Sequence, residues 1–293
     1  MSEKNLKPHL IVIVGPTASG KSKLAVRFAK KVKGEIVSFD AMQLYKGLPI
    51  LTNQPSKKER KGIPHHLIGF LPLHKEFSAA QFAKEAEKVI QEIADRGKVP
   101  LLVGGSGFYL KALLEGKHAP VEAVPALRKK YQRLFKEKGS ATLYEKLRAI
   151  DPVRAKKIHP NDAYRLMRAL EIYEATGRKP SEFAKGSGGI SGAFKVEKIG
   201  LRVPRKLLYE RIDRRVRKMI RDGVVAEVRR LFRKNLSLTA KRIIGLQELF
   251  SYLKGESSLE EAVSKMQQAT RRYAKRQETW FKKQKGIRWL SQW

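Results

Sequence analysis

Short apolar runs alternate with helix-like stretches in the first third of the chain. Residues 9–14 (HLIVIV) form an uninterrupted, largely β-branched run that ends at Gly-Pro, which is typical of a buried strand in a parallel sheet. Residues 21–32 place their apolar positions at helical spacing. Two more runs, 35–39 and 99–103, predict strands, and 78–96 between them predicts an amphipathic helix. Strands that alternate with helices predict an α/β protein with a doubly wound parallel sheet.

The pattern changes after about residue 116. Residues 117–185 contain no convincing strand, and stretches such as 126–138 and 142–150 have the Arg-, Lys- and Leu-rich character of helices. A glycine-rich stretch, GSGGISG at 186–192, is expected to be a flexible joint. We therefore predict a helical insertion domain at 117–185.

The strand pattern returns after the joint and then gives way to basic helices. Residues 196–203 predict a strand, 205–285 are mostly helical and basic, and 287–290 could form an edge strand. The core is thus expected to comprise residues 1–116 and 186–293, with a basic, helical C-terminal part.

The charge balance points to a polyanionic partner. Lys and Arg total 63 against 28 Asp and Glu, which gives a net charge of +35. Such a charge repels itself unless a polyanion lies nearby, so nucleic acid is the first partner to consider. The alternative is a solvated surface adapted to heat or salt.

The residues that are missing exclude several kinds of chemistry. The chain has no Cys, which rules out disulfides, Cys-ligated zinc, Fe–S clusters and thiol nucleophiles.

His65 and His66 are interpreted as a turn or a satisfied polar pair, because neighbours on a strand point to opposite faces and cannot share a metal. No apolar run approaches the ~18 residues of a membrane span, and the N-terminus lacks the pattern of a signal peptide. We expect a soluble, cytoplasmic protein.

A phosphate-binding loop follows the first predicted strand. The segment GPTASGKS matches G-x-x-x-x-G-K-[ST] and lies between a predicted strand and a predicted helix, as this motif requires. Its backbone N–H groups can surround an anion, Lys21 adds a point charge, and the Ser22 hydroxyl can hold Mg²⁺. The predicted diphosphate-binding residues are Gly15, Pro16, Thr17, Ala18, Ser19, Gly20, Lys21 and Ser22.

The rest of the pattern does not fit a hydrolytic NTPase. Such enzymes usually place a carboxylate at the end of a second apolar strand, but the run 99–103 is followed by GGSGFY. The nearest acid is Asp40, just past the run 35–39. A carboxylate there could act as a general base or near Mg²⁺, and the alternative is an Asp that caps the following turn.

Six blocks of sequence resemble motifs of the tRNA dimethylallyltransferase (tRNA isopentenyltransferase) family. The blocks are GPTASGKS at 15–22, FDAMQLYKGLPILTNQPS at 39–56, GIPHHLIGF at 62–70, VGGSGFYLKALLEG at 103–116, DPVRAKKIHPNDAYRLMRALEIYEATG at 151–177 and TRRYAKRQETWFKK at 270–283. Together they span nearly the whole chain. The resemblance implies transfer of a dimethylallyl group from dimethylallyl diphosphate to the N6 amino group of a tRNA adenine, expected at position 37 next to the anticodon.

The resemblance also implies roles for individual residues. Asp40 resembles the family's general base, Thr17 a residue that places the leaving oxygen or the base, and Arg215 an Arg that clamps the diphosphate. Mg²⁺ is the implied cofactor, tRNA and dimethylallyl diphosphate are the partners, and a monomer is expected. The implied tRNA contacts are Asp40, Ala41, Met42, Gln43, Ser106, Arg128, Tyr164, Arg165, Leu166, Met167, Arg168, Lys241, Arg242 and Gly245.

The chain departs from the family pattern in a few places. Ala41 stands where Ser is usual, Gln54 where Lys is usual, Gly69 where Asp is common, and Leu246 where Tyr is usual. These differences affect contacts with tRNA and diphosphate rather than the implied chemistry. The glycine-rich joint further suggests the hypothesis that the insertion swings when tRNA binds.

Three alternatives remain open at this point. A free-nucleotide (adenylate) isopentenyltransferase would share the loop and Asp40, but it does not need the long basic insertion. A small-molecule P-loop kinase explains only the loop. An RNA-binding module without activity rests on charge alone and leaves both the loop and Asp40 unexplained.

Overall fold

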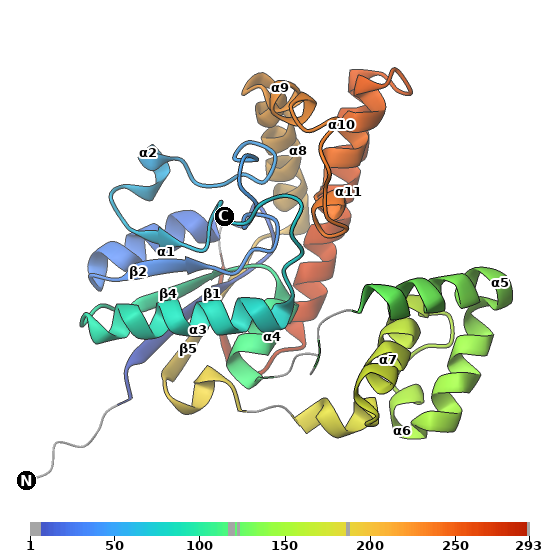
Figure 1. The fold of residues 1–293 in the computed structure, drawn as a ribbon. Helices are drawn as coiled ribbons and strands as arrows, with labels where there is room; N and C mark the ends of the chain where they lie inside the picture. The colour runs from blue at the N-terminus through green and yellow to red at the C-terminus, as the bar shows by residue number, and fades with distance from the viewer. Residues whose placement is uncertain (1–6, 117–120, 122–123, 186–187, 292–293) are drawn as a thin grey trace, which may run out of the picture.

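A single parallel sheet forms the centre of the protein. The computed structural model describes residues 7–116, 121, 124–185 and 188–291 (Figure 1). The sheet has six strands in the order β3-β2-β4-β1-β5-β6, and every neighbouring pair is parallel. The strands are β1 His9–Val14, β2 Glu35–Ser38, β3 His65–His66, β4 Pro100–Gly104, β5 Lys195–Arg202 and β6 Ile287–Ser291. The predicted α/β class is confirmed.

Both faces of the sheet are buried, as its apolar strands require. Along β1, Leu10 and Val12 pack into one core cluster, whereas Ile11 and Ile13 pack into another on the opposite face. The second cluster includes Ala25 of α1. Alternate side chains therefore enter two separate cores, which explains the continuous apolar run.

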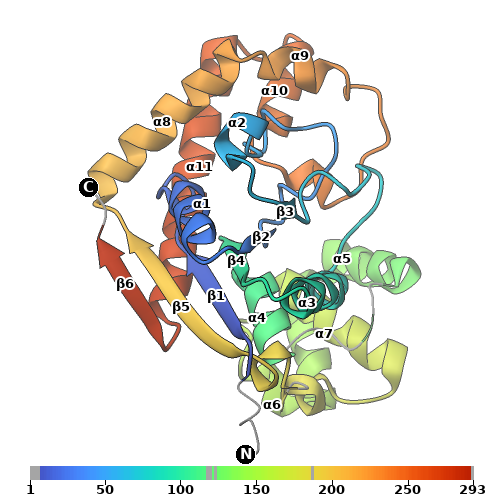
Figure 2. The same cartoon turned by 90° about the vertical axis from the view of Figure 1, so that its left-hand side faces the viewer.

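Helices of the core cover these two faces. Helix α1 (Lys21–Lys31) packs on one, while α3 (Ala79–Asp95), α4 (Gly107–Glu115) and residues of α11 (Leu259–Lys282) contribute to the cluster on the other. Figure 2 shows β6 at the outer edge of the sheet beside β5. The remaining helices of the core are α2 Lys57–Arg60, α8 Arg205–Arg221, α9 Val224–Arg229, α10 Leu246–Leu253 and the 3₁₀ turns η2 Ile190–Gly192 and η3 Ala240–Arg242.

Helices α5 (Pro125–Ile150), α6 (Pro152–Ala155) and α7 (Ala163–Thr176), with the 3₁₀ segment η1 (Pro180–Lys185), stand beside the sheet rather than over it (Figure 1). They have a core of their own, built from Tyr131, Leu143, Leu147, Ala155, Ile158, Leu166, Ala169 and Leu170. The backbone of α5 breaks at Gly139, which has φ 74°. The two helical stretches predicted on either side of this glycine are therefore confirmed.

The strand and helix predictions are close to the structure. β1 has the predicted limits, α3 begins after Ser78, whose side chain forms a capping box with Gln81, and the edge strand is β6. Strand β3 was not predicted, because two residues give no periodic pattern. His66 Nε2 pairs with Glu35 at 2.7 Å and His65 Nδ1 contacts Ile63 O at 2.9 Å, so the predicted satisfied polar pair is confirmed.

The predicted flexible joint at 186–192 differs from the structure in its second half. Residues 186 and 187 lie outside the described residues. Ile190 is buried, and the Ser191 hydroxyl donates to Leu114 O at 2.6 Å, so this half is fixed to α4. Among the described residues, no helix has both the length and the apolar character needed to cross a membrane.

Candidate active site

The phosphate loop connects β1 to α1 and is shaped to surround an anion. Gly15 has φ 157°, and a Cβ there would approach Ser19 Oγ to 2.9 Å. Gly20 has φ 91° at the N-cap of α1, where no side chain caps the helix, so the first N–H groups of α1 remain available. Ser19 Oγ is buried and has no hydrogen-bond partner within the described part of the chain. These features fit a bound phosphate oxygen.

Lys21 lies between charges of both signs. Its ammonium donates to Pro16 O at 3.3 Å. Burial lowers the pKa of Lys21 to about 8, while the nearby Asp40 carboxylate opposes this shift and the Arg215 guanidinium adds to it. The predicted base and the predicted clamp therefore both lie close enough to influence the loop lysine.

Arg215 reaches the loop from α8. Its Nη1 donates to Thr17 Oγ1 at 2.8 Å, and burial lowers its pKa while Asp40 opposes the shift. A planar guanidinium held in this way has further N–H donors that can face a diphosphate. The three residues predicted to be catalytic, Thr17, Asp40 and Arg215, thus line one cavity together with Lys21 and Ser22.

Asp40 follows β2 at the carboxyl end of the sheet, where ligands bind in open α/β sheets. Its Oδ1 accepts the Met42 N–H at 3.0 Å, so the carboxylate does close a local turn, as the alternative interpretation required. It also borders the cavity. The turn orients the carboxylate, and the two interpretations are therefore compatible. β4 ends in Gly104 with no acid, as predicted.

One wall of the cavity comes from α11, whose residues were not among the predicted site residues. Thr270 and Tyr273 line the cavity, and Gln277 lies one turn further along the same helix face. Burial raises the pKa of Tyr273, and the nearby Asp40 carboxylate acts in the same direction. The sequence did hold a signal, since these positions belong to the block at 270–283 and are spaced i, i+3 and i+7.

The segment after Asp40 is tied to other elements by backbone contacts. Ala41 N–H donates to Ser106 Oγ at 3.0 Å, and the Gln43 side chain donates to Asn53 O at 2.8 Å. The buried Glu227 carboxylate accepts the N–H groups of Ile50 and Leu51 at 2.9 and 2.8 Å, and burial raises the pKa of Glu227. Met42 and Gln43 line the cavity, and Ala41 and Ser106 form a hydrogen bond to each other beside Asp40. The contacts of these four residues with RNA stay a prediction.

Four of the more distant predicted tRNA contacts, Arg128, Tyr164, Met167 and Arg242, line a second hollow between α5, α7 and the core. Its lining includes Arg128 and Tyr164 from the helical insertion and Arg242 from the core. The Arg242 guanidinium lies 5.5 Å from the centre of the Tyr164 ring. Residues far apart in sequence therefore meet here, and Lys241 is exposed beside them.

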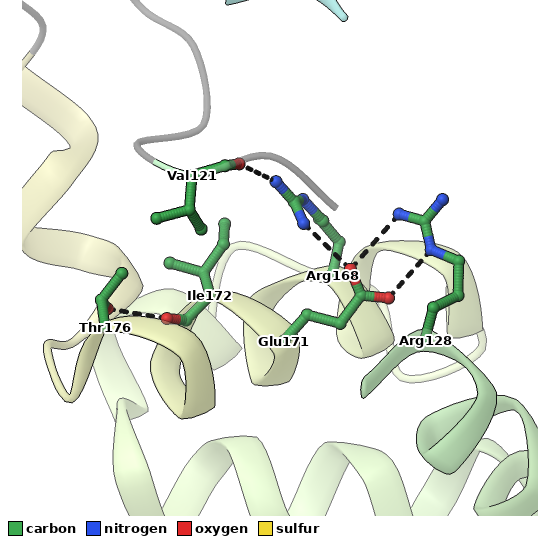
Figure 3. Close-up of polar contacts among 6 residues, drawn as sticks. All are labelled: Val121, Arg128, Arg168, Glu171, Ile172 and Thr176. Atoms are coloured by element: carbon green, nitrogen blue, oxygen red, sulfur yellow. Dashed lines mark hydrogen bonds and ion pairs between the residues drawn. The ribbon is translucent and has the colours of Figure 1, made fainter. Parts of the chain in front are cut away.

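A buried carboxylate holds two of the predicted contact arginines (Figure 3). Glu171, 2% exposed, accepts Arg128 Nε at 3.0 Å and Arg128 Nη2 at 3.3 Å, and it accepts Arg168 Nη1 at 2.9 Å. Arg168 also donates to Val121 O. Hydrogen bonding to Glu171 raises the pKa of Arg128. These arginines are oriented by the fold rather than freely solvated.

The other predicted contacts are in different environments. Arg165 is exposed and paired with Asp162 at 3.2 Å, whereas Met167 is half-buried beside the second hollow. The side chain of Leu166 is fully buried in the helical core and is not available to a ligand. Gly245 is also buried, and a Cβ there would approach Met266 and Leu51. Leu166 and Gly245 therefore help to pack their segments and offer no side chain to a ligand.

The cavity combines a phosphate loop, an oriented carboxylate and an arginine, which are features of a P-loop protein that binds a phosphate ester. It lacks the carboxylate that hydrolytic NTPases usually place at the end of a second strand. Residues 43–284 match the model of the IPP transferase family. A tRNA dimethylallyltransferase of Thermoanaerobacter sp. (strain X514) is 46% identical over 287 residues, covering 96% of this chain and 91% of that protein. One from Bacillus pumilus (strain SAFR-032) is 42% identical over 98% of this chain and 91% of its own length.

Solved structures agree with these sequence relatives. The tRNA isopentenylpyrophosphate transferase of Bacillus halodurans has a TM-score of 0.70 and 38% identity, covering 97% of this chain and 90% of that one. A eukaryotic dimethylallyltransferase acting on tRNA has a TM-score of 0.82 and 34% identity, covering 97% of this chain and 74% of that one. The chain belongs to the IPP transferase family of tRNA dimethylallyltransferases.

Proposed function

We propose that this protein transfers the dimethylallyl group of dimethylallyl diphosphate to the N6 amino group of a tRNA adenine, at position 37 next to the anticodon, and releases diphosphate. The observation that carries the proposal is the convergence of the phosphate loop, Asp40 and Arg215 on one cavity. In this reaction the N6–C1 bond forms as the C1–O bond breaks. One proton leaves the amine, and the bonding pair leaves with the diphosphate.

The residues of the cavity fit these requirements. Lys21 and Arg215 supply positive charge where the leaving group develops negative charge. Asp40, with Oδ1 held by Met42 N–H, presents its carboxylate as the acceptor of the N6 proton. Thr17, which accepts a hydrogen bond from Arg215, connects the loop to the clamp.

A magnesium ion fits this set of oxygen donors. No cluster of three acidic, His or Cys side chains occurs among the described residues, so a closed protein cage is not formed there. Mg²⁺ instead keeps several waters and binds through few protein oxygens and the substrate phosphates. The Ser22 hydroxyl would hold the ion, with Asp40 on the same cavity. When bound, it would neutralise charge on the diphosphate.

We propose that the helical insertion at 117–185 binds RNA and that residues 1–116 and 186–293 carry out catalysis. The adenine must leave its stack to reach the cavity, which requires the flanking RNA to be held elsewhere. The second hollow has arginines on both of its walls and lies between the two parts. Three observations favour tRNA over a free nucleotide as the acceptor. They are the second hollow, the net charge of +35 and the names of the relatives. We further propose that the enzyme acts as a monomer.

Parallel transfer assays with different acceptors test this choice. Labelled dimethylallyl diphosphate and Mg²⁺ are supplied with unmodified tRNA, with its isolated anticodon stem-loop, or with AMP. We expect label on the tRNA and none on AMP. Efficient transfer to AMP would instead make the protein a free-nucleotide transferase.

A further inference from the structure

The side chain of Gln277 connects two loops of the active site. It is 4% exposed and belongs to α11. Its Oε1 accepts the Thr17 N–H at 2.8 Å, and its Nε2 donates to Gly105 O at 3.0 Å. Thr17 lies in the phosphate loop and Gly105 directly follows β4, so one buried amide joins the two segments that frame the carboxyl end of the sheet.

The geometry leaves this amide a single orientation. Its acceptor faces an N–H and its donor faces a carbonyl, so turning the amide over would break both hydrogen bonds and leave buried polar groups unpaired. Space is equally restricted. A Cβ at Gly105 would lie 2.1 Å from Gln277 Nε2, so any side chain there must displace the amide.

Neighbouring contacts extend from Gln277 to the predicted base. The side chains of Gln277 and Ser106 both lie near the Tyr273 hydroxyl and lower its pKa, against the larger effect of burial. Ser106 Oγ in turn accepts the N–H of Ala41, the residue after Asp40. On the other side, Thr17 Oγ1 accepts the hydrogen bond from Arg215. Gln277 thus lies between the groups proposed to hold the diphosphate and the group proposed to take the proton.

We propose that Gln277 is a positioning residue, which fixes Thr17 and the phosphate loop relative to the Asp40 segment. The inference rests on the function proposed above and adds to it a residue that touches no reacting atom. A neutral amide is required at this position. A carboxylate would turn lone pairs toward Gly105 O and would place a negative charge behind the loop that binds diphosphate.

Three variants test the proposal with inorganic pyrophosphate as the probe. Gln277→Ala removes both hydrogen bonds. Gly105→Ala displaces the amide without changing it, since the new Cβ would occupy the place of Nε2. Alanine itself is not strained at this position, because Gly105 has no positive φ. For both we expect weaker pyrophosphate binding by calorimetry and a fall in kcat of about 10²-fold, since small misplacements of reacting groups have effects of this size. The KM for tRNA should stay within about twofold of wild type in both. The double variant should be no worse than either single one, because both remove the same connection.

The third variant, Gln277→Glu, adds a pH signature. Protonated Glu can donate to Gly105 O as the amide does, whereas ionised Glu cannot. Its pyrophosphate affinity relative to wild type should therefore rise as the pH falls, and the ratio for Gln277→Ala should stay flat. A residue with only a structural role would shift the melting temperature without this pH dependence. Gln284→Ala is the matched control, because its amide donates to Trp280 O away from the cavity.

The outcomes separate the inference from the proposed function. Wild-type binding of pyrophosphate by both Gln277→Ala and Gly105→Ala would overturn the inference. So would additive losses in the double variant. If wild type binds pyrophosphate but transfers no prenyl group, the proposed function fails, while the affinities of the variants still decide whether Gln277 positions the loop. If Gln277→Ala does not fold, Gly105→Ala and the pH profile of Gln277→Glu give the answer.

Discussion

The guanidinium of Arg215 donates a hydrogen bond of 2.8 Å to the hydroxyl of Thr17, a residue 198 positions earlier in the chain. The contact joins α8 to the phosphate loop. It also places a second cation beside Lys21. The proposed diphosphate site therefore includes a residue of α8, which follows helices α5–α7 in sequence.

Replacing Arg215 tests this clamp. We expect Arg215→Ala to lower kcat by about 10²–10³-fold, the usual effect of removing one preorganised donor to a developing anion. Arg215→Lys should recover only part of the activity, because an ammonium keeps the charge but lacks the planar fork. Arg217→Ala, on the exposed face of the same helix, is the control. Equal kinetics for Arg215→Ala and Arg217→Ala would contradict the assignment.

Asp40→Asn tests the proposed base without disturbing the local turn. The Asn carbonyl can still accept the Met42 N–H, so the melting temperature should hardly change. Transfer should fall by about 10²–10⁴-fold, since Asn cannot take up the N6 proton. Asp222→Asn provides an exposed comparison at the end of α8. Near-normal rates for Asp40→Asn at saturating substrate would show that another group accepts the proton.

Diphosphate binding should depend on pH through Lys21. The lysine is charged below its pKa, which burial lowers to about 8 in the free protein. A bound diphosphate favours the charged form, so affinity should be highest below about pH 8 and weaken above it, by up to about tenfold per pH unit. Calorimetry with pyrophosphate between pH 7 and 9.5 measures this. Lys21→Arg, which stays charged, should lack the decline, and an identical decline in that variant would assign it to another group.

The Glu171 carboxylate should contribute much more to stability than an exposed acid. Gln at this position would leave Arg128 and Arg168 without their buried counter-charge, at a cost of about 3–5 kcal/mol. Glu182→Gln breaks only the exposed pair with Arg178 and should cost about 0.3–0.5 kcal/mol. Urea unfolding compares the two. A similar small effect for both variants would show that the buried cluster is not what holds α5 to α7.

Two departures from the family pattern face each other in the structure. Gln54 Nε2 donates to Tyr45 O at 2.8 Å, and a Cβ at Gly69 would lie 3.1 Å from Gln54 Oε1. We expect Gly69→Asp to be destabilising alone, because Gly69 has a φ of 63°, which strains any side chain, and because the new carboxylate crowds Gln54. Adding Gln54→Lys should recover stability, with a coupling of about 0.5–3 kcal/mol measured by thermal unfolding of the four proteins. Purely additive effects would show that the two positions are not energetically coupled.

The sequence predicted those parts of the molecule that follow from local patterns. A continuous apolar run specified β1, and the amphipathic pattern at 78–96 specified α3. The loop at 15–22 has a fixed spacing because consecutive N–H groups must face one anion. Asp40 could be placed at the end of a strand because it directly follows the apolar run 35–39.

Long-range contacts could not be predicted in this way. Gln277 lies 260 positions from Thr17, and no periodicity reports that one buried amide joins them. The partner of Arg128 and Arg168 was equally hidden, since a Glu in a helix that carries charges of both signs looks like one more surface charge. Leu166 was assigned by its neighbours in a motif, although its own side chain points into the helical core.

The most direct test of the proposed function is the identity of the product. Unmodified tRNA is incubated with the protein, dimethylallyl diphosphate and Mg²⁺, and the digested nucleosides are analysed by mass spectrometry, with Asp40→Asn in parallel. If the proposed function is right, the wild-type reaction yields N6-dimethylallyl adenosine and the variant yields much less of it. Unmodified adenosine in the wild-type reaction, or the same yield from Asp40→Asn, would contradict it.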